Sequence, residues 1–60
     1  MRFCCRVSND RGHTWCFVVE NTNWHGLRAI AEKELAARVA SDPLHAKYGP
    51  WRVGFIDVCA

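Results

Sequence analysis

Three cysteines and one histidine fall within fifteen residues near the start of the chain, in the segment FCCRVSNDRGHTWCF (residues 3–17). Cysteine thiolates and histidine nitrogens are ligands that structural zinc prefers, and a cysteine beside a histidine is a common nucleophile–base pair. The segment is therefore a candidate zinc site, a candidate catalytic pair, or a β-hairpin that is rich in sulfur. Its predicted geometry distinguishes the three.

The elements that position these residues form a predicted β-hairpin. Residues 3–7 and 14–19 are short, apolar and β-prone, and the tetrad NDRG at residues 9–12 suits a type I turn closed by a glycine bulge. That turn places Arg2 opposite Glu20, where we expect a cross-strand ion pair. It also gathers the apolar strand residues on one face of the hairpin: Phe3, Cys5, Val7, Trp15, Phe17 and Val19.

In this register the candidate ligands cannot meet. Cys4 and Cys16 point to one face of the hairpin, and Cys5 and His13 point to the other. His13 also lies roughly 13 Å along the strand from the position opposite Cys5. We therefore predict no metal site, no cofactor and no catalytic residues, and a protein that is not an enzyme. A disulfide between Cys59 and either Cys4 or Cys5 is left open.

A helix and a last strand follow the hairpin. We expect Asn23 to cap a helix that ends near residue 40. Residues 42–48 predict one or two further helical turns that Asp42 caps, and residues 51–59 predict a third strand. The long helix carries an apolar stripe at four-residue steps: Leu27, Ala31, Leu35 and Val39.

The element order β-β-α-β predicts one small α+β domain over residues 1–60. Because the helix returns the chain, the third strand runs antiparallel to the first, and the simplest sheet places these two strands side by side. The predicted fold is thus a three-stranded, mainly antiparallel sheet of order 2-1-3, with one long helix packed on one face.

One helix covers only one face of a three-stranded sheet, so the uncovered face is the informative one. We assign Trp51, Val53 and Phe55 to the covered face. Small apolar side chains mixed with arginines then remain on the other, a composition typical of a contact surface. The short helical segment over residues 42–48 is the alternative cover for part of it. The uncovered set is Arg2, Cys4, Arg6, Cys16, Val18, Arg52, Gly54, Ile56 and Val58.

The parity of the third strand stays open, because its two sets of alternate residues are nearly equally apolar.

Composition and charge narrow the function classes further. The formal net charge is +2, which is weak for a protein that relies on phosphate contacts, and six of the eight cations are arginines, the residues favoured at interfaces. No apolar run reaches the ~18 residues that span a bilayer, and the first ten residues lack the apolar core of a signal peptide. We therefore expect a cytoplasmic protein with reduced thiols and no membrane partner.

We interpret the chain as a small protein-binding module that uses the uncovered face. A Met-initiated chain of 60 residues without a catalytic constellation is typical of accessory proteins of phages and mobile elements. Many of these inhibit or modulate a host complex, for example a CRISPR-Cas defence system. The expected partner is a host protein or protein complex, and a homodimer is also compatible. The predicted partner-binding residues are Arg2, Arg6, Arg11, Val18, Arg52, Ile56 and Val58.

The alternative function is nucleic-acid binding through the arginines of the sheet and the turn. Unpaired bases stack on exposed aromatic rings of a sheet, and arginines contact phosphates. The low net charge and the assignment of the aromatic residues to the helix-covered face count against this alternative.

Overall fold

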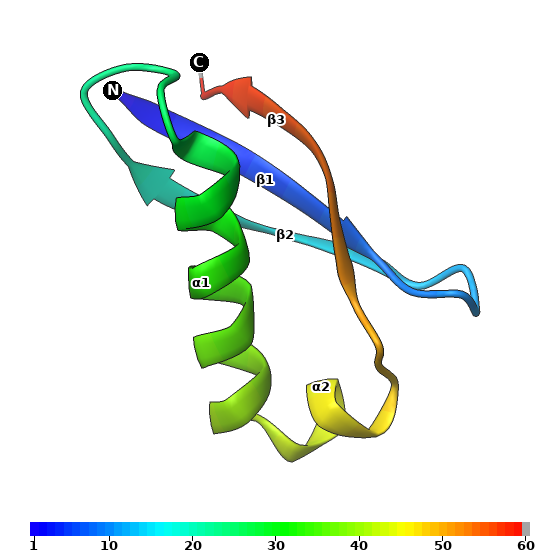
Figure 1. The fold of residues 1–60 in the computed structure, drawn as a ribbon. Coiled ribbons are helices and arrows are strands. Elements are labelled where there is room, and N and C mark those ends of the chain that lie inside the picture. Colours follow the sequence, from blue (N-terminus) through cyan, green and yellow to red (C-terminus); the bar gives the residue numbers. More distant parts are fainter. Residues whose placement is uncertain (60) are drawn as a thin grey trace.

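The computed structural model describes residues 1–59, and within them the chain forms three strands and two helices. The strands make one sheet in the order β2-β1-β3, and both strand pairs are antiparallel. Figure 1 shows α1 against one face of this sheet, with α2 between the end of α1 and the start of β3. The predicted α+β fold and its strand order are therefore confirmed. The elements are β1 (Arg2–Ser8), β2 (Thr14–Glu20), α1 (Leu27–Ser41), α2 (Pro43–Lys47) and β3 (Arg52–Val58).

Asn9 organises the turn between β1 and β2. Its Oδ1 accepts hydrogen bonds from the backbone N–H groups of Arg11 (3.0 Å) and His13 (2.9 Å). Its Nδ2 donates to the backbone carbonyl of Tyr48 at 2.8 Å and lies 3.1 Å from Nδ1 of His13. These partners satisfy a polar side chain on a residue that is only 5% exposed. The turn is thereby tied to the end of α2, and Gly12 completes it with a φ of 85°.

The predicted register of the hairpin is confirmed along its whole length, including the match of Arg2 with Glu20. The ion pair predicted between these two residues is not formed. The ion pairs among residues 1–59 join other residues. Both side chains are exposed at the strand ends, where an ion pair in water contributes little free energy.

The long helix begins three residues later than predicted. The side chain of Asn23 accepts a hydrogen bond from the N–H of His25 at 2.8 Å, so it closes a local turn and does not cap the helix. Gly26 precedes α1 with a φ of 67°, a left-handed conformation that a helix cannot continue through. Trp24 therefore lies outside α1, and its ring packs edge-on against Phe3 with centroids 4.8 Å apart.

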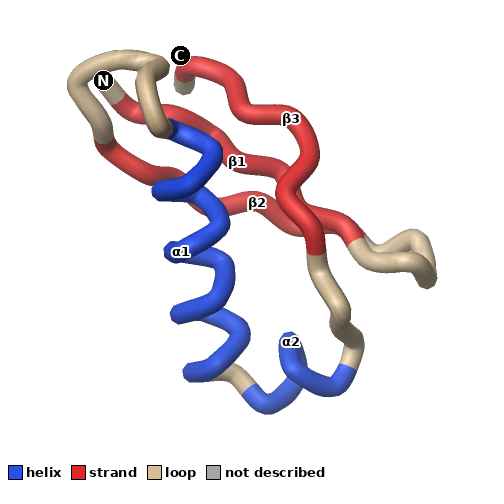
Figure 2. Tube along the Cα trace, in the orientation of Figure 1, coloured by secondary structure: helices blue, strands red, loops and turns tan. Residues whose placement is uncertain are grey.

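The core lies between α1 and the sheet. It consists of the alternate strand residues and the helix stripe that the sequence predicts, but Trp15 is only partly buried, and so is Val39 near the C-terminal end of α1. Figure 2 shows the reason for Val39, because the last turns of α1 extend past the strands. The buried apolar side chains among residues 1–59 are Phe3, Cys5, Val7, Phe17, Val19, Leu27, Ala31 and Leu35.

The short helix α2 closes one end of this core. The His45 ring stacks on Trp15 with centroids 4.4 Å apart and planes 3° from parallel. Nε1 of Trp51 donates to the carbonyl of His45 at 2.6 Å. Asp42 caps α2 as predicted, since its side chain accepts from the N–H of Leu44 at 2.9 Å. Because Trp15 points to the same side of the sheet as the core, α2 does not cover the opposite face, and that alternative is wrong.

Candidate protein-binding face

A β-bulge in β3 decides which of its side chains point away from α1. Cys5 pairs with Ile56 and Val7 pairs with Val53, so two residues of β3 lie opposite the one residue between Cys5 and Val7. The extra residue reverses the alternation of side chains along the strand. The two residues at the bulge are Gly54 and Phe55, and the residue opposite them is Arg6.

The predicted parity of β3 is correct before the bulge and wrong after it. Ile56 pairs with Cys5 and Val58 with Phe3, both core residues of β1, so Ile56 and Val58 lie on the helix-covered side. The sequence predicts Phe55 on that side as well, yet it is 77% exposed. Sequence reasoning therefore missed the most exposed large apolar side chain of the face away from α1. A glycine inside a strand pattern is the signal that indicates such a bulge, and Gly54 supplies it.

The guanidinium of Arg28 in α1 stabilises the bulge. Its Nη1 donates to the carbonyl of Val53 at 3.1 Å and its Nη2 donates to the carbonyl of Gly54 at 2.9 Å. The planar guanidinium of an arginine suits two adjacent acceptors, so the carbonyls at the bulge, where the strand pairing is irregular, have hydrogen-bond donors.

Burial raises the pKa of the Cys5 thiol, and the positive charge of Arg28 offsets part of that rise.

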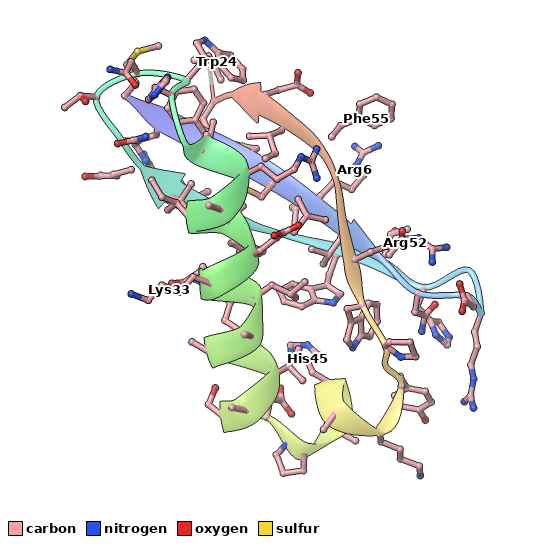
Figure 3. The ribbon with its side chains drawn as sticks, in the orientation of Figure 1. Arg6, Trp24, Lys33, His45, Arg52 and Phe55 are labelled. Carbon is pink, nitrogen blue, oxygen red and sulfur yellow. A yellow bond between two sulfur atoms is a disulfide. The ribbon has the colours of Figure 1, made fainter. Side chains whose placement is uncertain are left out.

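The sheet surface that the helices leave uncovered is called the open face below. Arg2 and Arg6 are exposed on it, and neither forms an ion pair with another residue in the 1–59 range. Val18 is 39% exposed. Figure 3 shows Arg6, Arg52 and Phe55 on the side of the sheet away from α1. The strand residues of the open face are Arg2, Cys4, Arg6, Ser8, Thr14, Cys16, Val18, Glu20, Arg52, Phe55 and Asp57.

The open face contains a small surface depression. A depression of about 280 Å³ lies beside Phe55, between a cation and an anion, Arg6 and Asp57. Cys4 and Cys16 also line it. The surface therefore combines an aromatic ring, a guanidinium without a counter-ion and a small concavity, which suits contact with another molecule more than contact with bulk water.

Two further predicted binding residues lie toward the hairpin turn. Arg52 donates through Nη1 to Oδ1 of Asp10 at 2.8 Å, but both side chains are well exposed, so this ion pair is held only weakly. Arg11 lies in the turn, with its Cζ 5.8 Å from the centroid of the Tyr48 ring. Of the seven predicted partner-binding residues, Arg11 flanks the open face, Ile56 and Val58 lie on the covered side, and the open face holds Arg2, Arg6, Val18 and Arg52.

A disulfide joins Cys4 to Cys59, whose Cα atoms are 5.5 Å apart. The choice that the sequence left open is thus decided in favour of Cys4, because Cys5 points into the core. The N–H of Cys59 also donates to the carbonyl of Arg2 at 2.9 Å, so the end of β3 is fastened to the start of β1. Cys16 is free and exposed on the same face, whereas Cys5 is free and buried.

A second concavity lies on the helix side. It is an open groove of about 550 Å³ between the C-terminal half of α1 and the start of β3, and Glu32 and Arg52 are among its lining residues. Its lining is mainly apolar, including Leu35, Val39 and Trp51. It has no convergent set of polar side chains of the kind that orients a small-molecule ligand.

Within residues 1–59, no three His, Cys, Asp or Glu side chains are grouped so that they could hold a metal ion. The helices in this range are also too short and too polar to cross a membrane. Comparison of the chain with protein-family models, with curated proteins and with solved structures found no match.

Proposed function

We propose that this chain is a non-enzymatic protein-binding domain that docks through the open face. The observation that carries the proposal is Phe55, a large aromatic side chain that is 77% exposed beside the unpaired guanidinium of Arg6. Aromatic residues and arginine are the side chains that most often dominate protein interfaces. Seven of the eleven strand residues of the open face are polar or charged, as in a sheet face that meets water, so Phe55 and not the overall composition of the face supports the proposal.

The charges of the open face define the partner surface that would fit it. Arg2 and Arg6 lack counter-ions among the described residues, so carboxylates on the partner would form ion pairs with them. Phe55 would enter an apolar pocket between those carboxylates. We propose that the domain inhibits or modulates its partner by occupying that surface. We propose a protein of a host complex as the partner, as for accessory proteins of phages and mobile elements.

We place this activity in the cytoplasm as part of the same proposal. The disulfide between Cys4 and Cys59 differs from the reduced thiols expected from the sequence and counts against this placement, because cytosolic thiol reductants keep accessible disulfides reduced.

A second candidate function is single-stranded nucleic-acid binding. The bulge favours it, because it brings Phe55 to the face that carries Arg2 and Arg6, where a base could stack on the ring. The acidic residues Glu20 and Asp57 on the same face count against it, and the formal net charge is only +2. Protein binding is therefore the first proposal.

Capture from a host lysate tests the proposal with matched variants. Phe55→Ala and Arg6→Glu change the open face, whereas Lys33→Glu makes the same charge change as Arg6→Glu on an exposed position of α1, away from the open face (Figure 3). We expect one protein to be retained by the wild type and by Lys33→Glu. Loss of an interface anchor costs about 2 kcal/mol or more, so Phe55→Ala should weaken binding by roughly 30-fold.

Oligonucleotide binding separates the two candidates. A nucleic-acid-binding face would show affinity that falls steeply between low and physiological salt, with a slope set by the phosphates it neutralises. Retention of the same protein by all variants would contradict the first proposal. Salt-sensitive oligonucleotide binding that Phe55→Ala abolishes, with no protein captured, would favour the second.

A further inference from the structure

The two edges of the sheet formed by residues 1–59 differ in their protection. On the β3 edge, the bulge interrupts the strand, and Arg28 occupies the carbonyls of Val53 and Gly54. The β2 edge is a regular strand of 7 residues, TWCFVVE, without proline, glycine, lysine or a bulge. Natural proteins protect exposed edge strands with those same features, because an unprotected edge pairs with another strand. β2 is therefore the edge that is open to pairing.

The hydrogen bonds of the hairpin show which residues of β2 offer free backbone groups. The N–H of Asn9 bonds to the carbonyl of His13, and the N–H of Asn21 bonds to that of Met1. Both contacts belong to the register of β1 and β2, so the odd-numbered residues of β2 bond to β1 and the even-numbered residues point outward. Within residues 1–59, no other backbone hydrogen bond engages the outward residues, which are Thr14, Cys16, Val18 and Glu20.

We propose that β2 pairs with β2 of a second copy of this chain, antiparallel across a two-fold axis at Phe17, so that the two sheets become one. The outward residues are spaced evenly about Phe17, so this register matches Thr14 with Glu20 and Cys16 with Val18 in both directions. Every outward N–H and carbonyl of both strands then gains a partner, with about eight hydrogen bonds in total. A two-fold axis needs such a self-complementary strand.

The charges agree with this arrangement. Glu20 is the only charged residue of β2, and in the proposed register it faces Thr14 of the other copy and not a second carboxylate. On the helix side, Arg38 lies over the Phe17 ring, with its Cζ 5.1 Å from the centroid. The same guanidinium bonds to Glu34 at 2.8 Å, so the cation nearest the axis carries its own counter-ion. Neither Glu20 on β2 nor Arg38 over Phe17 therefore meets an uncompensated like charge in this register.

Pairing at this edge would place the two open faces on one side of a continuous sheet. A partner with two binding sites, or a symmetric partner, would then be held at both faces, with an affinity gain that requires no new contact. The pairing uses the backbone of β2 and does not depend on what the open face binds.

Sedimentation equilibrium from micromolar to millimolar concentration tests the pairing. Val18→Pro removes an outward N–H of β2, which an edge strand tolerates in the monomer. Val58→Pro is the matched control on the other edge of the sheet. Val58 pairs with Phe3, and the backbone groups of Phe3 bond to β2, so the N–H of Val58 points outward from β3. We expect a dimer for the wild type and for Val58→Pro. Because of the two-fold axis, Val18→Pro removes two hydrogen bonds from the dimer interface. This loss should raise the dissociation constant of the dimer about tenfold or more.

Hydrogen exchange of the wild type gives a second readout if Val18→Pro does not fold. The amides of Cys16 and Val18 should exchange more slowly as the concentration rises, while the amide of Val58 should not change. A wild type that stays monomeric at millimolar concentration would overturn the proposal. The proposal would also be overturned if Val18→Pro folds and still dimerises, or if Arg6→Glu on the open face abolishes the dimer. Exchange of the Cys16 and Val18 amides that does not depend on concentration would overturn it too.

Discussion

Replacing Cys59 with serine should remove a large part of the stability of this domain. The disulfide between Cys4 and Cys59 joins residues that are 55 positions apart, so it closes nearly the whole chain into one loop. In the chain-entropy model, a loop of that length restricts the unfolded chain by about 4 kcal/mol at 25 °C. Domains of this size have a total free energy of unfolding of roughly 3–9 kcal/mol. The Cys59→Ser variant should therefore be only marginally folded.

Urea unfolding, followed by the fluorescence of Trp15 and Trp51, measures the loss. With a slope of about 1–2 kcal/mol per molar urea, expected for a small protein, Cys59→Ser should lower the midpoint by roughly 2–4 M. Cys16→Ser is the control, because Cys16 is free and exposed, and its midpoint should match that of the wild type. A reductant should lower the wild-type midpoint to the Cys59→Ser value and leave that variant unchanged. Equal midpoints for Cys59→Ser and Cys16→Ser would refute the reasoning.

Three further predictions concern the core and the bulge. Arg28→Met removes both hydrogen bonds to the bulge carbonyls and should lower the free energy of unfolding by about 1 kcal/mol. Lys33→Met on the same helix should leave the free energy of unfolding unchanged. Equal thermal midpoints for the two variants would contradict the role of Arg28. Leu35→Ala should cost about 2–4 kcal/mol in denaturant unfolding because Leu35 is buried, and Leu44→Ala, at a 64% exposed position, should cost less than about 0.5 kcal/mol. Burial raises the pKa of the Cys5 thiol above its ordinary value of 9.0, so its contribution to stability is complete below that pH and is lost as the pH rises through the folded-state pKa. Unfolding measured from neutral to alkaline pH should therefore show a steeper decline for the wild type than for Cys5→Ala, and parallel curves would count against the burial effect.

The hairpin could be predicted in detail because its information is local. The turn residues at 9–12 fix the loop length, and the loop length fixes which residues face each other. The apolar residues then fall on one face, which also determines the face that α1 must cover. The same local logic predicted the cap of α2 at Asp42.

The second half of β3 could not be predicted in this way, because strict alternation from Val53 places Phe55 with the core and only the bulge reverses that alternation. The position of the bulge depends on a contact between elements that are far apart in the sequence, namely the hydrogen bonds from Arg28 to Val53 and Gly54. Asn9 is a similar case, since its partner Tyr48 lies 39 positions away. The start of α1 was missed for a local reason, because Asn23 and Gly26 both suit a helix boundary and the left-handed Gly26 is the one that forms it.

The most direct test of the open face is side-chain footprinting of the chain with and without its captured partner. Hydroxyl radicals modify exposed side chains, and Phe55 and Leu44 are 77% and 64% exposed in the free chain. Leu44 lies on α2, away from the open face, and serves as the internal reference. Docking through the open face predicts that modification of Phe55 falls in the complex while that of Leu44 is unchanged. Unchanged modification of Phe55, with protection of Leu44 instead, would contradict the account.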